Sequence, residues 1–260
     1  MCGRYASSRR PEDLVAEFEV SDARVTHALE PDYNVAPTKE VYAVVQRPPR
    51  PPEGAPADTP RGPAERQLRV LRWGLVPSWA KDPAIGNRMI NARMETVAEK
   101  PAFRRAFATR RCLLPADGYF EWYPTQQVSK AGKSVKQPFF ITPKDGGILA
   151  MAGLYEIWKD PTRDEDDPDR FRWTCTVLTT EAEDAVGHLH DRMPLMVDRK
   201  RWAAWLDPAP APTDDLLGLL TPAALGNLDA YPVATLVNNV RNNGPELLDP
   251  LPLDETPPGG

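Results

Sequence analysis

The chain has 260 residues, of which 41% are hydrophobic and 27% charged, and its net charge is −5. These values predict a packed fold of one large or two small domains. They exclude an intrinsically disordered protein, which has too few hydrophobic residues to form a core. Three scattered cysteines argue against a disulfide framework or a zinc site, and no apolar run approaches the ~18 residues that span a membrane. With no signal-peptide pattern at its start, we expect a cytoplasmic monomer that uses no metal, cofactor or membrane.

Strands outnumber helices among the predicted elements. The first helix is predicted at 11–18, where a proline opens it and acidic residues occupy its first turn. Runs rich in aromatic and β-branched residues predict strands at 40–46, 67–72, 111–115, 118–123, 138–142, 148–158, 171–179 and 231–237. The remaining helices are predicted at 94–107 with a break at Pro101, and at 180–186, 198–206 and 213–219.

The connections between these elements complete the expected fold. Segment 48–63 is rich in proline and predicts a disordered or polyproline-like hairpin insertion, while the acidic segment 160–170 predicts a hairpin loop. Because the strands do not alternate regularly with helices, we expect an α+β fold with a mainly antiparallel sheet or barrel core flanked by short helices. A single domain would span 2–250, and 251–260 would form a flexible tail.

Charge is unevenly distributed along the chain. Residues 69–112 contain ten basic and three acidic side chains, whereas residues 206–260 contain one basic and eight acidic side chains. Binding to a polyanion depends on a local patch and not on the total charge. Charge counts alone leave two interpretations open for 69–112, a solvated basic helix face and a DNA-binding surface.

Cys2 follows the initiator methionine directly. If Met1 is trimmed, the chain begins with a cysteine whose α-amine has a pKa of about 7.7–8.0, against roughly 10.4 for lysine. The neutral amine attacks aldehydes to give imines, and the neighbouring thiol can then close a five-membered thiazolidine ring. Position alone leaves open whether Cys2 is such an aldehyde trap or only a small residue after Met1.

Six short segments are dense in the polar and aromatic residues that build sites. They are Tyr33–Thr38, Trp73–Trp79, Asn91–Thr96, Asp117–Trp122, His190–Pro194 and Val237–Asn242. In this order, after an opening Cys2-Gly3-Arg4-Tyr5, they resemble the SOS-response-associated peptidase (SRAP) family, which is known for capturing abasic sites in single-stranded DNA. The resemblance runs from Cys2 to about Pro250 and leaves out the 48–63 insertion.

This resemblance implies a mechanism and a set of site residues. Cys2, after loss of Met1, would form a thiazolidine with the ring-opened aldehyde of an abasic deoxyribose. The catalytic residues would be Cys2, Asn91, Glu121 and His190. Thr179 would lie nearby, and Arg4, Arg93, Trp122 and Arg192 would contact DNA.

The residue types suit the catalytic roles. His190 is one of three histidines and would shuttle protons to open the closed sugar. Glu121 would take a proton from the Cys2 ammonium, or it would lie on the polar side of an alternating strand. Asn91 would orient the sugar or the Cys2 carbonyl, or it would serve as a turn or cap residue. The pair His188 and His190 lacks a third ligand for a metal.

The residue types also suit contacts with DNA. Arg93 and Arg192 would bind phosphates through their guanidinium groups. Trp73, Trp79 and Trp122 could stack on bases or fill the gap left by the missing base, with Trp122 the strongest candidate. Cys112 and Cys175 lie in apolar strands and are interpreted as inert core thiols.

Three functions follow as hypotheses. The leading one is a protein that crosslinks to abasic sites in single-stranded DNA, shields them from strand cleavage and has some lyase activity. The second is a thiol peptidase or autopeptidase that uses Cys2. The third is a non-covalent single-stranded DNA binding module, which would bind in a salt-sensitive way without depending on Cys2.

Overall fold

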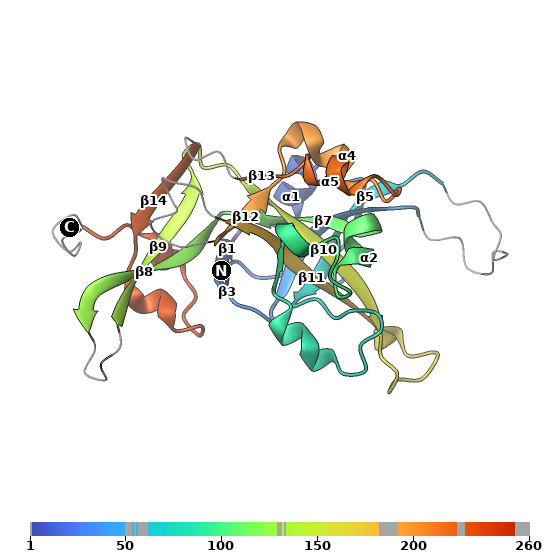
Figure 1. The fold of residues 1–260 in the computed structure, drawn as a ribbon, viewed down its shortest axis with the longest axis horizontal. Helices are drawn as coiled ribbons and strands as arrows, with labels where there is room; N and C mark the ends of the chain where they lie inside the picture. Colours follow the sequence, from blue (N-terminus) through green and yellow to red (C-terminus); the bar gives the residue numbers. More distant parts are fainter. Residues whose placement is uncertain are drawn as a thin grey trace.

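The computed structural model describes residues 2–49, 54, 56, 62–128, 132, 134–181, 192–222 and 227–252. These residues form one mixed α/β domain in which strands dominate and short helices flank two sheets (Figure 1). The α+β prediction is therefore confirmed. Within this part of the chain, no helix has the length and apolar character needed to cross a bilayer.

The smaller sheet has five strands. Its order is β14 (Leu228–Pro232), β9 (Ser134–Pro143), β8 (Gly118–Val128), β1 (Tyr5–Ser7) and β3 (Asp32–Val35). Every pairing in it is antiparallel, and β1 joins β8 through the pairs Tyr5↔Tyr119 and Ala6↔Gly118. This pairing places the residues that precede Tyr5 beside the start of β8.

The larger sheet has nine strands. Its main path is β13 (Thr221–Pro222), β12 (Arg192–Met196), β10 (Leu149–Lys159), β7 (Arg111–Ala116), β4 (Glu40–Arg47), β5 (Glu65–Trp73), β11 (Phe171–Glu181) and β6 (Asn91–Arg93), and β2 (Asp22–Arg24) pairs with β5. A β10–β11 pairing bends this sheet back on itself. Only two residue pairs join β5 to β11, so the strands do not make a regular closed barrel.

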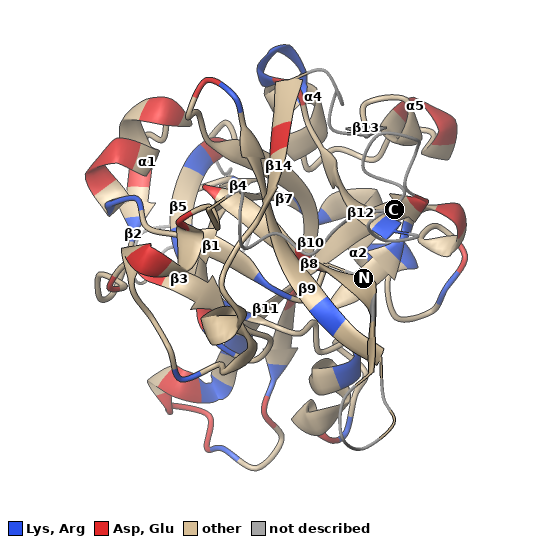
Figure 2. Ribbon diagram, turned by 90° about the vertical axis from the view of Figure 1, so that its left-hand side faces the viewer, with Lys and Arg blue, Asp and Glu red and all other residues tan. Residues whose placement is uncertain are grey.

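The helices are short. They are α1 (Pro11–Glu17), α2 (Arg104–Thr109), α4 (Trp202–Leu206) and α5 (Thr213–Leu217), with 3-10 turns η1 (Pro83–Arg88), η2 (Met94–Thr96), η3 (Pro168–Arg170), η4 (Arg199–Arg201), η6 (Thr235–Asn238) and η7 (Pro245–Leu248). Acidic residues lie on α1 and α5 (Figure 2).

The structure corrects several predicted boundaries. The strand predicted at 231–237 ends at Pro232, and Thr235–Asn238 form the 3-10 turn η6 instead. The helix predicted at 94–107 is divided into η2 and α2, as the break at Pro101 required. Of the helix predicted at 180–186, the first two residues extend β11 and the rest lies outside the described residues.

The two predicted hairpins are present. β4 and β5 pair in antiparallel register from Glu40↔Arg72 to Arg47↔Glu65, which makes 48–63 the connection between hairpin strands. Most of this connection lies outside the described residues. β10 and β11 pair in the same antiparallel manner around the acidic loop 160–170.

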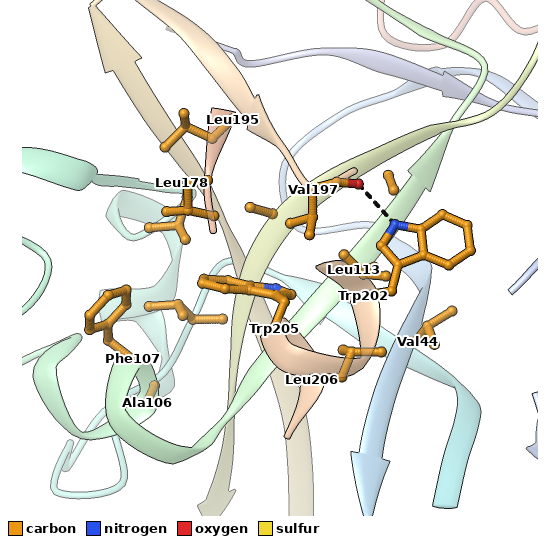
Figure 3. Close-up of a cluster of buried hydrophobic side chains, with 14 of the residues drawn as sticks. Val44, Ala106, Phe107, Leu113, Leu178, Leu195, Val197, Trp202, Trp205 and Leu206 are labelled. Atoms are coloured by element: carbon orange, nitrogen blue, oxygen red, sulfur yellow. Dashed lines mark hydrogen bonds between the residues drawn. The ribbon is translucent and has the colours of Figure 1, made fainter. Parts of the chain in front are cut away.

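One apolar core fills the space between the helices and the larger sheet (Figure 3). Trp202 and Trp205 lie three residues apart on α4 and are 5% and 0% exposed. They share one helix face because three residues make nearly one turn. Trp202 donates its indole N–H to the Val197 carbonyl at 2.8 Å, which fixes the start of α4 against the strand side of this core.

A second apolar core lies between the two sheets and contains Cys2, Tyr5, Trp73 and Tyr119. Neighbouring residues of β8 point to opposite faces, so Phe120 packs in a third cluster on the other side of the smaller sheet. Alternation along β8 thus decides which of its side chains can reach Cys2.

Gly74 lets the chain after β5 pack closely against η1. Its φ of +122° lies in the region that favours glycine, and a Cβ there would approach the Gly86 carbonyl oxygen to 2.6 Å. The Gly74 N–H donates to the Cys175 carbonyl at 2.8 Å, and the Leu75 N–H to the Met89 carbonyl at 3.1 Å. This segment then delivers Asn91 on β6 beside β11.

Candidate active site around Cys2

Cys2 is fully buried between the two sheets. Its carbonyl oxygen accepts a hydrogen bond of 2.8 Å from Nδ2 of Asn91, a residue of β6 that pairs with Val177 of β11. The structure thus shows the contact between Asn91 and the Cys2 carbonyl that was one of the predicted alternatives. Cys2 is tied to β1 by the chain and to β6 by this bond.

The Cys2 thiol is held in its neutral form. Burial raises the pKa of the thiol well above its ordinary value, and the nearby Glu121 carboxylate raises it further. A hydrogen bond from the Arg4 backbone N–H acts in the opposite direction without cancelling these effects. A thiolate is therefore not the resting form of this residue at physiological pH.

Glu121 is a buried carboxylate on β8, with 3% of its surface exposed. It does not lie on the solvent side of its strand, which was the competing interpretation. Tyr119 lies two residues earlier on the same face, and its hydroxyl is buried without a hydrogen-bond partner among the described residues. Burial, followed by the charges of Cys2 and Glu121, raises the pKa of Tyr119. These effects place the three side chains in one electrostatic environment.

Arg4 and Trp122 are partly buried and contact each other. The Arg4 guanidinium carbon lies 5.4 Å from the centroid of the Trp122 ring, which is cation–π geometry. Arg4 Nη1 also donates to Asn34 Oδ1 at 2.6 Å and to the Val237 carbonyl at 2.8 Å. Trp122 donates its indole N–H to Asn238 Oδ1 at 2.6 Å.

Asn34 joins two of the motifs that the sequence singled out. It is fully buried in β3, and its Nδ2 donates to three carbonyls of the segment 237–242. Those acceptors, at 3.0–3.2 Å, are Val237, Asn239 and Asn242. Asn34 therefore holds Arg4 and the 237–242 segment in fixed positions, although no role was predicted for it. Its place inside a dense polar motif was the one available signal.

Arg192 is not an open phosphate ligand in this structure. Only 8% of it is exposed, and its two terminal nitrogens donate to the Glu95 carboxylate at 3.1 and 3.0 Å. The same side chain donates to the carbonyl and hydroxyl oxygens of Thr179, which is itself 1% exposed. Glu95 occupies the guanidinium fork of Arg192 here, and the predicted contact of Arg192 with phosphate stays a prediction. Thr179 lies nearby, but it is too buried to touch DNA.

The pKa of Glu95 reflects its pairing with Arg192. Burial of Glu95 would raise the pKa of its carboxyl, but the hydrogen bond and charge of Arg192, together with backbone hydrogen bonds, outweigh burial and lower this pKa. The pair fastens η2 to β11 and β12 beside β6.

Arg93 is exposed at the end of β6, on the same side of the strand as Asn91. It makes no ion pair with any residue that the structure describes. Its predicted contact with phosphate stays a prediction, and its exposure is compatible with one.

Trp73 does not face solvent. It is fully buried, its indole N–H donates to the Ile90 carbonyl at 2.9 Å, and its ring centroid lies 5.2 Å from that of Tyr5. Trp73 therefore belongs to the core between the sheets, and this position does not support the predicted stacking of Trp73 on DNA. In the same motif Trp79 is 59% exposed, and the sequence had given it the weakest case.

Two further predictions concern histidine and cysteine. His190 lies outside the described residues, as do His188 and Asp191, so its role stays a prediction. Cys112 and Cys175 are buried thiols, and burial raises the pKa of each, in agreement with inert core positions. Across the described ranges, no group of three or more histidine, cysteine or acidic residues is arranged to hold a metal ion.

The order of these motifs agrees with a known family. The family model described as SOS response associated peptidase (SRAP) matches residues 1–240. The chain belongs to the SRAP family. Its sequence therefore carries the family pattern through β1, β8 and the segment that contains η6.

Relatives within the SRAP family match nearly the whole chain. The abasic site processing proteins YoqW and YoaM of Bacillus subtilis are 35% and 36% identical to it, each over 96% of this chain and 99% and 98% of their own lengths. The abasic site processing protein HMCES of Xenopus tropicalis is 30% identical, over 95% of this chain and 78% of its own. A solved structure of a Bacteroides thetaiotaomicron protein, 23% identical, covers 96% of this chain and 100% of its own with a TM-score of 0.75, which supports the fold alone.

Proposed function

We propose that this SRAP protein processes abasic sites in single-stranded DNA by forming a covalent crosslink through Cys2. The observation that carries the proposal is the position of Cys2, which is held by Asn91 beside a buried Glu121 carboxylate. The names of its relatives, which are abasic site processing proteins, support the same substrate.

The chemistry starts from a chain that has lost Met1. The α-amine of Cys2 adds to the C1′ aldehyde of the ring-opened sugar, and loss of one water gives an imine. The Cys2 thiol then adds to the imine carbon, the sulfur proton moves to the nitrogen, and a thiazolidine ring closes. One water is released overall, and no oxidant or cofactor is consumed.

Glu121 supplies the proton transfers that this sequence needs. An α-ammonium must lose a proton before it can attack, and a buried carboxylate near Cys2 can accept that proton. Because the thiol is neutral, we propose that the amine attacks first and the thiol adds second. His190 would serve in opening the closed sugar.

Closure of the ring also protects the DNA strand. An imine acidifies the neighbouring sugar carbon and promotes β-elimination, which would cut the strand as a lyase does. Addition of the thiol removes the imine, so crosslinking and cleavage compete for one intermediate. The exposed Arg93 would hold a flanking phosphate, and Arg4 and Trp122, which pack on the other face of the smaller sheet from Cys2, would contact DNA there.

The test uses single-stranded DNA with one uracil that a uracil glycosylase has converted to an abasic site. We expect an adduct that survives a denaturing gel, and we expect Cys2→Ala to abolish it. Cys112→Ala is the matched control, because it removes a buried thiol from the same core and should leave the adduct intact. An adduct that persists in Cys2→Ala would overturn the proposal.

A further variant addresses the proton acceptor. Glu121→Gln keeps the shape of the side chain but removes its basicity, so we expect adduct formation about a hundredfold slower. The mass of the mature protein should be that of a chain without Met1. If Met1 is retained, the Cys2 nitrogen is part of an amide and cannot form the imine. Release of Met1 by the purified unprocessed protein alone would instead support the autopeptidase hypothesis.

A further inference from the structure

A cluster of arginines surrounds Trp173 at the end of the larger sheet. The guanidinium carbons of Arg47 and Arg69 lie 5.0 and 4.2 Å from the centroid of the Trp173 ring. Tyr155 of β10 stacks on the same ring, with centroids 5.6 Å apart and planes 11° from parallel. Side chains from β4, β5, β10 and β11 thus fix these two cations in place.

This cluster is separate from the candidate active site. Asn91, which holds Cys2, pairs with Val177, and Trp173 lies four residues earlier on the same strand β11. At about 3.3 Å per residue, that separation is roughly 13 Å along the strand. None of the residues assigned to the Cys2 chemistry belongs to the cluster.

Arg24 is paired with Asp22, but Arg47 and Arg69 carry positive charge that no described carboxylate pairs with. Arg69 donates its Nε–H to the neutral Gln67 side chain at 2.9 Å, and neither Arg47 nor Arg69 forms an ion pair within the described part of the chain. Arg24 lies opposite Arg69 on β2. Burial, then the charges of Arg47 and Arg24, lower the pKa of Arg69 to about 10, so it stays protonated at physiological pH.

Two carboxylates face this cluster from neighbouring strand positions. Asp22 is bound by Arg24 at 2.6 Å, and Glu65 is the cross-strand neighbour of Arg47. Holding like charges together raises the free energy of the folded protein. A bound anion would lower it, and two guanidinium groups of fixed position suit phosphate oxygens.

An exposed aromatic side chain adjoins the cations. Phe171 is 53% exposed and lies on the same side of β11 as Trp173, two residues away. Lys159 of β10 pairs directly with Phe171 and is also exposed. Phe171 is therefore a direct cross-strand neighbour of Lys159 and lies two residues from the Trp173 ring that the Arg69 guanidinium covers.

Cations alternating with an exposed aromatic face favour a single-stranded nucleic acid as the partner. Its phosphates would bind the guanidinium groups while a base stacks on the ring. An acidic peptide would satisfy the cations but leave Phe171 in water. We propose that this Trp173 surface binds single-stranded DNA that extends from an abasic site held at Cys2; its residues are Arg24, Arg47, Arg69, Lys159, Phe171 and Trp173. The link to an abasic site rests on the proposed function, whereas binding of an intact strand does not.

The experiment measures non-covalent binding in a Cys2→Ala background by fluorescence anisotropy of labelled oligothymidylate. One strand is about 4 nucleotides long and the other about 16, the range that single binding modules cover. We expect the double variant Arg47→Gln with Arg69→Gln to bind the long strand roughly tenfold more weakly. The slope of log affinity against log salt should fall by about 1.4, for two phosphate contacts on a single strand. Phe171→Ser should weaken binding roughly fivefold or more, because a stacked base is lost.

Arg199→Gln is the matched control, because it removes one charge from a side chain that is 57% exposed on η4. Equal losses in the control and in the cluster variants, or no loss in either, would overturn the proposal. Tighter binding of poly-glutamate than of oligothymidylate would identify an acidic peptide as the partner and would also overturn it. Phe171→Ser keeps the test decisive if the double arginine variant does not fold.

The outcome is distinguishable from that of the proposed function. A short abasic strand at saturating protein should still crosslink to the cluster variants, because these keep Cys2 and its neighbours. Absence of any adduct in the unmodified protein would reject the crosslinking function. Loss of long-strand binding in the cluster variants would still support the Trp173 surface.

Discussion

Two buried regions of the molecule differ in how their polar groups are bonded: the helix ends around Arg111 and the surroundings of Cys2. At the helix ends, Arg111 is 2% exposed and every hydrogen bond shown for it goes to a backbone carbonyl. The acceptors are Phe107, Ala108, Trp205 and Asp207, at the ends of α2 and α4. Around Cys2, Asn91 Oδ1 and the Tyr119 hydroxyl are buried and have no partner among the described residues.

This difference separates a polar group whose hydrogen bonds are made within the fold from polar atoms that have no described partner. Arg111 donates to the last carbonyls of α2 and α4. It thereby removes the free-energy cost of leaving those buried carbonyls without a hydrogen bond. A buried polar atom without a partner costs about 1–3 kcal/mol, and such atoms are rare outside functional sites. Asn91 donates a hydrogen bond to the Cys2 carbonyl, and the charge of Cys2 contributes to the raised pKa of Tyr119.

The largest expected effect is at Arg111. We expect Arg111→Met to lower the free energy of unfolding by about 3–5 kcal/mol, because it leaves buried carbonyls without their charged donor. Urea denaturation measures this change. Arg199→Met, at an exposed position, should cost less than about 0.5 kcal/mol. A loss below about 1 kcal/mol at Arg111 would remove the contrast between the two regions.

Substitutions of Asn34 test whether a buried side chain with several hydrogen bonds near Cys2 contributes to stability as Arg111 does. We expect Asn34→Ala to cost about 2–3 kcal/mol, because it breaks bonds to Arg4 and to three carbonyls. Asn34→Asp keeps an acceptor for Arg4 but loses the donors, so it should release the 237–242 segment while retaining part of the stability. Hydrogen exchange at residues 237–242 measures that release. Unchanged protection in both variants would contradict the role of Asn34.

Alkaline pH should weaken the core between the sheets. Cys2, Cys112 and Cys175 all lie in that core, and burial raises the pKa of each above its ordinary value of 9.0. Because the unfolded thiols ionise first, stability is complete below about pH 9 and falls as pH rises from there toward the folded pKa values. The expected slope is about 1.4 kcal/mol per pH unit for each thiol.

Urea unfolding at a series of pH values tests the alkaline loss. Cys175→Ala should reduce the loss of unfolding free energy per pH unit by the share of one thiol. It should also lower stability at neutral pH, because the removed sulfur leaves a cavity. A stability that stays constant between pH 8 and pH 10 would show that the thiols titrate alike in both states.

The smallest expected effect is at Tyr119. Because its hydroxyl is buried without a described partner, Tyr119→Phe should leave the free energy of unfolding unchanged or raise it by up to about 1 kcal/mol. The rate of adduct formation should fall if the hydroxyl contacts the sugar. A loss of stability above about 1 kcal/mol would show instead that the hydroxyl has a structural partner.

Local pattern was sufficient for much of the fold. The strands predicted at 40–46 and 148–158 were found because β-branched and aromatic residues continue through both. The strand predicted at 231–237 was displaced, because β14 runs from Leu228 to Pro232 and residues 235–238 turn into η6. The short strands β1, β3 and β6 were missed, since three or four residues carry too little periodicity.

Local pattern did not settle which site residues are open to DNA. Trp73 and Trp79 belong to one motif, yet one is fully buried and the other is 59% exposed. Arg192 had the composition of a phosphate ligand, but Glu95, 97 residues away in the chain, occupies its guanidinium group. Neither outcome can be read from neighbouring residues, because both depend on how β5 and β12 are placed in the sheet.

The sequence by itself determined the chemistry available at Cys2, because the amine and thiol of a cysteine are covalently adjacent in any fold. It also determined the family, through motifs whose order does not depend on their positions in space. Only the tertiary structure decided which polar groups surround Cys2 and which are already partnered. The physical reason is that these contacts join distant segments, as Asn91 and Cys2 show at a separation of 89 residues, and burial sets the free energy of each polar group only after the sheets have packed.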